Sequence, residues 1–211
     1  MAPAGEGQLA ANRFLSKTEE NADFNQYWYS NLTIDALVKA CTVDAPTEDD
    51  AAKPPIRAAF LSTPSLYHSL PVKARKSCAL LDLDPEVKGS CPEEKFYAYD
   101  FNKPDEIPAH FHRAFDLIVI DPPFITHEVW EKYAAAVAVL GDPSSPYCTA
   151  EGGVRVLGTT VAENANLMKR LFSATSQKFK PSIPHLVYQY DTYANYPCQP
   201  LDAANPEIPE D

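Results

Sequence analysis

The chain has 211 residues, a net charge of −11 and 45% hydrophobic residues, which is enough for one domain with a full core. It shows neither a long apolar run nor a basic, apolar leader, so we expect a cytoplasmic protein without a membrane span. The acidic balance disfavours general nucleic-acid binding, because carboxylates repel phosphate. The five cysteines form no close pair, and the five histidines show no ligand spacing beyond His110 and His112, which are expected in a loop, so we expect neither disulfides nor a metal site.

Composition divides the chain into a domain and three polar stretches. Residues 1–24 are expected to be a flexible N-terminus with room for a short helix, and residues 25–196 to form the domain. Within it, 42–55 is expected to be an acidic, solvated loop, and 197–211 should be a disordered, acidic, proline-rich tail. Both acidic stretches are poor in aromatic residues, and ordering them would cost more entropy than their burial returns.

Three adjacent aromatic residues precede the first predicted helix. Tyr27, Trp28 and Tyr29 lead into a helix over 32–40, with Asn31 or Thr33 as its cap. Three neighbours cannot share one helical face. We therefore expect these rings either to pack in the core or to close a pocket over a ligand.

Strand and helix signals alternate through the rest of the domain, which is typical of an α/β fold with a mostly parallel sheet. Helices are expected at 65–70, at 129–140 and after a capping box at 160–163. The seven expected strands are 56–61, 78–83, 95–99, 115–120, 154–158, 178–183 and 186–193. The last two flank Pro184, so they should form an antiparallel pair at the sheet edge.

Polar residues follow four of these strands, and in an open parallel sheet ligands bind at such carboxyl ends. The first is followed by Ser62, Thr63, Pro64 and Ser65 rather than by glycines. A pyrophosphate cradle is therefore not expected, which argues against NAD or ATP. The hydroxyl groups suit the carboxylate of an amino-acid ligand instead.

Acidic residues follow the next two strands. Asp82, with Asp84 one side-chain period further, suits the hydroxyls of a ribose. Asp100 suits the amino group of adenine, with Phe101 against the ring. Each acid alone would indicate a turn, but their joint placement favours one ligand.

The fourth strand ends at Asp121, Pro122, Pro123 and Phe124. Proline offers a carbonyl but no donor, so the ladder stops there. The Asp121 carboxylate and the Pro122 carbonyl are both acceptors, and together they can hold an amino group beside the flat face of Phe124. The motif resembles that of amino-methyltransferases, which implies S-adenosylmethionine as cofactor and contact of Asp121 with both reactants.

The resemblance extends over several ordered motifs, from about Asn25 to Tyr196. These are Gln26–Ser30, Phe60–Tyr67, Leu81–Asp84, Tyr97–Asn102 and Asp121–Phe124. Together they resemble the lysine methyltransferases of translation elongation factor 1-alpha, a family once grouped with N6-adenine-specific DNA methyltransferase-like proteins. The resemblance implies a Rossmann-like class I methyltransferase fold, elongation factor 1-alpha as the protein substrate, and substrate contacts from Tyr27, Trp28, Tyr29 and Phe124.

Two other functions stay open at this point. The same acceptors would serve the exocyclic amine of adenine, although the acidic balance and the lack of a target-recognition domain count against it. A partner subunit that binds cofactor without catalysis is the other alternative, and the intact motif at Asp121 counts against that.

Overall fold

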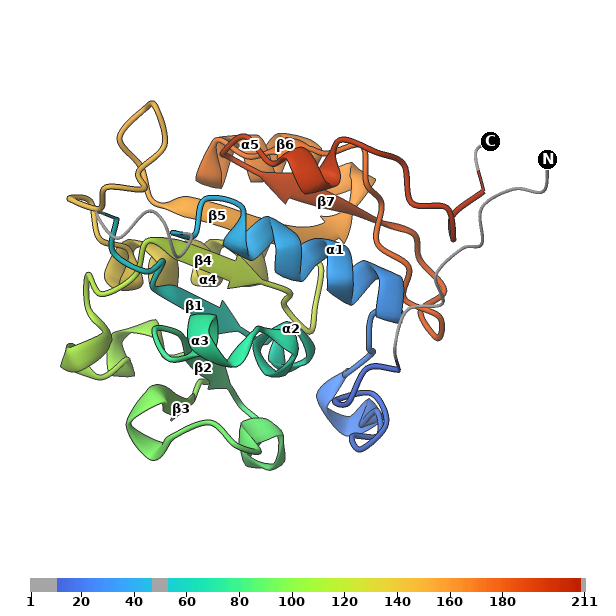
Figure 1. Ribbon diagram of the computed structural model, residues 1–211, viewed down its shortest axis with the longest axis horizontal. Helices are drawn as coiled ribbons and strands as arrows, with labels where there is room; N and C mark the ends of the chain where they lie inside the picture. Colours follow the sequence, from blue (N-terminus) through green and yellow to red (C-terminus); the bar gives the residue numbers. More distant parts are fainter. Residues whose placement is uncertain (1–10, 47–52, 210–211) are drawn as a thin grey trace.

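The computed structural model describes residues 11–46 and 53–209, which form a central sheet between two layers of helices (Figure 1). The seven strands lie in the order β3-β2-β1-β4-β5-β7-β6. β7 runs antiparallel to both of its neighbours, and the other pairs are parallel. The strands are β1 Ala58–Leu61, β2 Ala79–Asp82, β3 Phe96–Ala98, β4 Leu117–Ile120, β5 Arg155–Val161, β6 Thr175–Ser176 and β7 Tyr190–Ala194. The predicted seven-stranded, mostly parallel sheet with an antiparallel edge is confirmed.

The helices are divided between the two faces of the sheet. One face is covered by α1 Asn31–Thr42, drawn in blue across the front of Figure 1, with α2 Pro64–Ser69 and α3 Val72–Arg75 beside it. The other face is covered by α4 His127–Leu140 and α5 Ala165–Phe172. The single-turn 3-10 helices are η1 Ala22–Phe24, η2 Pro85–Lys88, η3 Glu93–Lys95, η4 Pro104–Glu106, η5 Ala109–Phe111, η6 Ala162–Asn164 and η7 Gln199–Leu201.

The central strands β1, β2 and β4 are apolar except for Asp82 at the end of β2, because helices cover both of their faces. Every residue of β1, β2 and β4 is buried. Gly158 of β5 gives room to the helices behind the sheet: a Cβ there would lie 3.3 Å from both Trp130 of α4 and Met168 of α5. The carboxyl ends of the strands are therefore held on a rigid platform.

Two expected elements are wrong, and in both cases hydrogen bonds to distant residues explain the difference. The predicted strand 178–183 is irregular, because the Phe179 amide donates to the Leu201 carbonyl rather than to a strand; β6 lies earlier instead. The predicted capping box 160–163 is not one: Thr160 lies within β5 and its hydroxyl accepts from Trp130 Nε1.

The cap of α1 also differs from the two predicted candidates. Neither Asn31 nor Thr33 caps the helix; Ser30 does, since its hydroxyl accepts from the Thr33 amide at 3.1 Å. The Thr33 hydroxyl accepts instead from the amide of Ser182 at 2.9 Å, which fastens α1 to the segment before β7.

The segments expected to be flexible or solvated make contacts at several points that the structure describes. The tail expected to be disordered over 197–211 packs on α1 through the fully buried Leu201, and Asn205 donates to the Lys180 carbonyl at 2.8 Å. Near the N-terminus, Phe14 is buried edge-on against Trp28, and η1 is a short helix within 1–24. Residues 1–10, 210–211 and the centre of the acidic loop, 47–52, lie outside the described residues.

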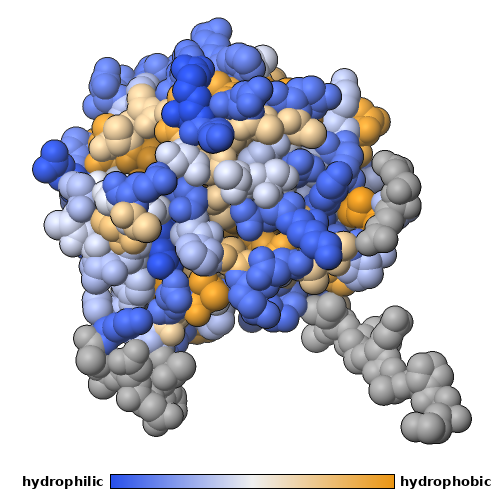
Figure 2. Space-filling model, turned by 90° about the horizontal axis from the view of Figure 1, so that it is seen from above, coloured by the Kyte–Doolittle hydropathy of each residue, from blue (hydrophilic) through white to orange (hydrophobic). Residues whose placement is uncertain are grey.

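Neither the hydropathy of the surface nor the helices, possible metal ligands and cysteines of the described residues point to a second site away from the strand ends. The face in Figure 2 is mainly hydrophilic, with small separated hydrophobic patches. None of the described helices has the length and apolar character needed to cross a membrane. Within the same residues no group of His, Cys, Asp or Glu could hold a metal, and the five cysteines are free thiols.

Candidate active site

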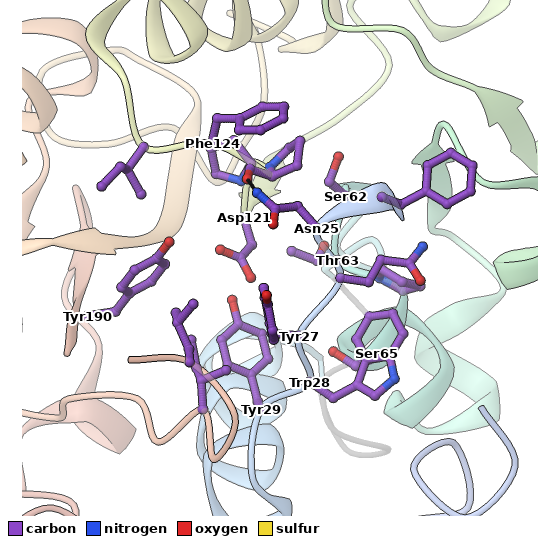
Figure 3. A pocket seen from close by; sticks show the side chains of 18 of the residues that line it. Asn25, Tyr27, Trp28, Tyr29, Ser62, Thr63, Ser65, Asp121, Phe124 and Tyr190 are labelled. Atoms are coloured by element: carbon purple, nitrogen blue, oxygen red, sulfur yellow. Dashed lines mark hydrogen bonds between the residues drawn. The ribbon is translucent and has the colours of Figure 1, made fainter. Parts of the chain in front are cut away.

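A cavity of about 370 Å³ opens at the carboxyl ends of β1, β2 and β4. Three kinds of segment form most of its walls: the turns after β1, β2, β3 and β4, residues 24–29 ahead of α1, and residues 183–190, which lead into β7. Tyr133 of α4 also lines the cavity. Figure 3 shows side chains from all three converging on the acid that follows β4. The cavity therefore lies where the sequence predicted the ligand site.

Asp121 stands at the centre of a chain of hydroxyl groups. The Thr159 hydroxyl of β5 donates to Asp121 Oδ1 at 2.9 Å, and the Tyr29 hydroxyl lies 2.6 Å from Thr159 Oγ1. Thr159 Oγ1 therefore lies within hydrogen-bond distance of both the Asp121 carboxylate and the Tyr29 hydroxyl. Figure 3 shows the Tyr29 hydroxyl pointing toward Asp121. The carboxylate is thus held in one orientation.

The surroundings of Asp121 also change its acidity. Removal from water raises its pKa to about 6, and hydrogen bonds from Tyr29 and Thr159 partly oppose that rise. The carboxylate is still mostly ionised at neutral pH. It can therefore accept a hydrogen bond from an incoming amine.

The carbonyl groups of the two prolines after Asp121 differ in their hydrogen bonding. Asn25 Nδ2 donates to the Pro123 carbonyl at 2.7 Å, which ties the N-terminal segment to this turn. Among the described residues, no hydrogen bond reaches the Pro122 carbonyl. Phe124 is 49% exposed and lines the cavity with both prolines. The predicted catalytic residues therefore share one cavity, and their roles stay predictions.

The turn after β1 presents one hydroxyl without a partner. Ser62 adopts φ +55°, a left-handed conformation that glycine usually fills, and its hydroxyl is paired with Tyr133 at 2.7 Å. Thr63 Oγ1 is buried and has no hydrogen-bond partner among the described residues. Pro64 and Ser65, both buried, open α2 and line the cavity. The Thr63 hydroxyl is therefore the group best placed to donate to a ligand.

Asp82 is the buried acid that fits a ligand with hydroxyl donors. Its carboxylate accepts from the Asp84 amide at 3.0 Å, and no described cation pairs with it. Burial raises its pKa to about 7, with the nearby Asp84 charge adding to the rise. Two ribose hydroxyls would supply the donors that an ionised carboxylate here lacks.

The structure places two of the predicted cofactor residues outside the cavity walls. Asp84 Oδ2 accepts from Gln26 Nε2 at 2.9 Å and its other oxygen caps η2, while Asp100 accepts from the amide and side chain of Asn102. Both acids have the turn and tether roles that single acids often have. Phe101 does line the cavity, stacked on Tyr133 with ring centroids 6.0 Å apart.

Core packing, one of the two expectations for the three aromatic residues, is confirmed for Trp28 and Tyr29, and closure of the pocket over a ligand stays a prediction. Trp28 and Tyr29 are buried, and both line the cavity together with Tyr27. Thr159 and Tyr190 have no counterpart in the sequence prediction of the site. Thr159 hydrogen-bonds to Asp121 but does not line the cavity, whereas Tyr190 lines it and has a pKa raised by burial and by the Asp121 charge. The only sequence signal for Thr159 is that it directly follows the strand predicted over 154–158.

The strand order, the antiparallel β7 and the acidic turn after β4 at a carboxyl-end cavity define a class I S-adenosylmethionine-dependent methyltransferase fold. A family model described as probable N6-adenine methyltransferase matches residues 20–198, and the chain belongs to that family.

Curated relatives of the chain are named as protein-lysine N-methyltransferases. The EEF1A lysine methyltransferase 1 of Gallus gallus is 30% identical over 64% of this chain, and the match spans 61% of that protein. A protein-lysine N-methyltransferase of Caenorhabditis elegans is 29% identical over 86% of this chain and 81% of its own. The EEF1A lysine methyltransferase 1 of Mus musculus is 28% identical, with 84% and 76% covered.

Solved structures resemble the chain more distantly. A protein of Corynebacterium glutamicum has a TM-score of 0.48 and 9% identity, covering 87% of this chain and 94% of its own. Human methyltransferase-like protein 13, solved in complex with SAH, has a TM-score of 0.38 and 13% identity, covering 83% and 84%. The fold assignment rests on the strand order rather than on these likenesses.

Proposed function

We propose that the protein transfers a methyl group from S-adenosylmethionine to a lysine side chain of translation elongation factor 1-alpha. The observation that carries the proposal is the pair of acceptors, the Asp121 carboxylate and the Pro122 carbonyl, that line one cavity beside exposed Phe124. The names of the chicken and mouse relatives support the choice of substrate.

Two residues fit the proposed cofactor on their own chemistry. The unpartnered Thr63 hydroxyl suits its amino-acid carboxylate, and the Asp82 carboxylate suits its ribose hydroxyls. S-adenosylmethionine supplies, when bound, a methyl group on a positively charged sulfur. No buried cation opposes that charge, because the described cavity walls contain neither Lys nor Arg.

Asp121 acts in this proposal by holding and aiming the target amine. A lysine ammonium has a pKa of about 10.4 and must lose a proton, which passes to solvent water, before its nitrogen has a lone pair to donate. With a pKa of about 6, the Asp121 carboxylate is too weak a base to take that proton completely. It accepts an N–H hydrogen bond instead, while Pro122 accepts a second, so that the lone pair points at the methyl carbon.

The aromatic walls complete the site for a cationic target. Tyr27, Phe124 and Tyr190 line the cavity around Asp121 (Figure 3). The nitrogen gains positive charge as the new N–C bond forms and the sulfur keeps the electrons of the broken S–C bond. Ring faces and a carboxylate both stabilise that charge.

One experiment tests both lysine methylation and the alternative, methylation of adenine. The protein is incubated with S-adenosylmethionine labelled in its methyl group, separately with elongation factor 1-alpha and with adenine-containing DNA and RNA. We expect label on a lysine, located by mass spectrometry of the digested protein, and none in the Asp121→Asn variant. Label in adenine would establish the alternative, and no label on any of the three would leave a cofactor-binding subunit.

A further inference from the structure

Large exposed apolar side chains gather at the mouth of the cavity. The six in the described part of the chain are Phe24, Val72, Leu83, Phe124, Val187 and Tyr188. All but Val72 line the cavity, and we call these five the apolar rim. Val187 and Tyr188 are the most exposed of the rim, at 87% and 62%. Exposed apolar groups that cluster around one opening mark a contact surface rather than chance exposure.

The rim is assembled from separate segments that hydrogen bonds hold together. One carboxylate oxygen of Glu20 accepts from the Trp28 amide at 2.8 Å, and the other accepts from His185 Nδ1 at 2.7 Å. The bond from Asn25 to the Pro123 carbonyl joins the same N-terminal segment to the turn that carries Phe124. The surface is therefore formed before a partner arrives, which lowers the entropy cost of docking.

The charges inside the rim select the kind of partner. The ionisable groups on the cavity walls are the carboxylates Asp82 and Asp121, tyrosine hydroxyls, and His185 at the mouth. A nucleic acid would bring phosphates toward these carboxylates, at a cost that no lysine or arginine on the walls offsets. A polypeptide that inserts an amine and leaves apolar side chains outside matches both the charge and the rim.

We propose that the apolar rim docks the segment of the substrate protein that carries the target lysine, and that it selects lysines flanked by apolar side chains. The inference rests on the proposed function in one respect, that the inserted group is a lysine. Leu83 and Phe24 lie on different segments from Val187 and Tyr188, so flanking residues on both sides of the lysine meet an apolar partner.

Binding of short fluorescent peptides to the protein saturated with S-adenosylhomocysteine tests the proposal without requiring catalysis. One peptide carries Leu and Val on both sides of a lysine, and the other carries Ser at the same positions. By fluorescence anisotropy we expect the apolar peptide to bind at least 10-fold more tightly. The double variant Val187→Ser/Tyr188→Ser should lose that preference, and Val72→Ser, the matched exposed residue on α3, should keep it. Equal binding of the two peptides, or a preference that survives the double variant, overturns the proposal.

Two parallel measurements separate this inference from its alternatives. Methyl transfer to elongation factor 1-alpha reports on the proposed function alone, so a rim-dependent peptide preference without transfer would refute the function and keep the docking surface. Light scattering reports on self-association. A dimer of the parent protein that the double variant converts to a monomer would assign the rim to a second copy of this chain and overturn peptide docking. Circular dichroism should show the same fold in all variants, since the substituted side chains are exposed.

Discussion

The Thr159 hydroxyl on β5 donates to Asp121 Oδ1, reaching the acid from the neighbouring strand. Strand register sets this relationship: Ile120 and Gly158 are paired across β4 and β5, and the two residues that interact follow them directly. The orientation of the acid is therefore built into the sheet rather than into the flexible end of a loop.

Thr159→Val should slow methyl transfer by roughly 10–100-fold, because a hydrogen bond to a charged group contributes about 1.5–3 kcal/mol. It should also move the acidic limb of the kcat profile above pH 6, since this bond lowers the pKa of Asp121. Steady-state kinetics from pH 5 to 9 measure both effects.

Thr192 supplies the control for that substitution. It is paired with Thr159 in the register of β5 and β7, is equally buried, and its hydroxyl has no hydrogen-bond partner among the described residues. Thr192→Val should leave the rate and the pH profile unchanged. If Thr159→Val behaves like Thr192→Val, the hydroxyl chain has no part in the reaction.

Asp121→Asn should reduce transfer by at least 100-fold while leaving the protein at least as stable as the parent above pH 6. In the folded protein the pKa of Asp121 is about 6, above its ordinary value of about 3.9. The folded parent therefore loses stability relative to the unfolded chain as the pH rises from about 4 to about 6. The amide removes that loss, on the order of 1–3 kcal/mol. Thermal melting at pH 5 and pH 8 measures the difference, and near-parent turnover in Asp121→Asn would remove the carboxylate from the mechanism.

Asp82→Asn should weaken binding of S-adenosylhomocysteine by about 10-fold or more at pH 8, because a buried charged acceptor is replaced by a neutral one. With a pKa of about 7, Asp82 is protonated below neutral pH, and a ligand that needs the carboxylate must first displace the proton. Parent affinity should therefore fall by up to ~10-fold for each pH unit below 7. Calorimetry should show that slope in the parent and in Asp121→Asn, and not in Asp82→Asn; an unchanged affinity in Asp82→Asn would place the ribose elsewhere.

Gly158→Ala should destabilise the protein by about 1–3 kcal/mol, because the added Cβ would lie 3.3 Å from both Trp130 and Met168 in a packed layer. Gly153→Ala is the matched control, since its Cβ would meet only Thr149 Oγ1 at 3.6 Å. Chemical denaturation compares the two. Equal denaturation midpoints for the two variants would show that the side chains of α4 and α5 behind β5 shift to make room for the added methyl group.

The local sequence pattern of apolar runs and polar ends correctly predicted the central strands and two acidic residues of the cavity. The central strands β1, β2 and β4 lie within their predicted ranges, because buried apolar runs end at polar residues there. For the same reason, Asp82 and Asp121 were expected in the cavity and are found in it.

The parts that sequence could not supply depend on contacts between distant segments. No strand forms at the predicted range 178–183, because the Phe179 amide hydrogen-bonds to Leu201. The contact of Thr159 with Asp121 depends on the pairing of β4 with β5. Asp84 and Asp100 have the sequence pattern of ligand-binding acids, but neither lines the cavity: Asp84 accepts from Gln26 and Glu86, and Asp100 Oδ1 accepts from Asn102.

The hydroxyl chain that ends at Asp121 also bears on when the site forms during synthesis. Tyr29 and Thr159 are 130 positions apart, and the Glu20–His185 pair spans 165. A nascent polypeptide can assemble its first four strands while the acid still lacks Thr159 and the wall formed by residues 183–190. Reactivity should therefore arise only once residues 183–190 have left the ribosome, and products released before that point should be inert.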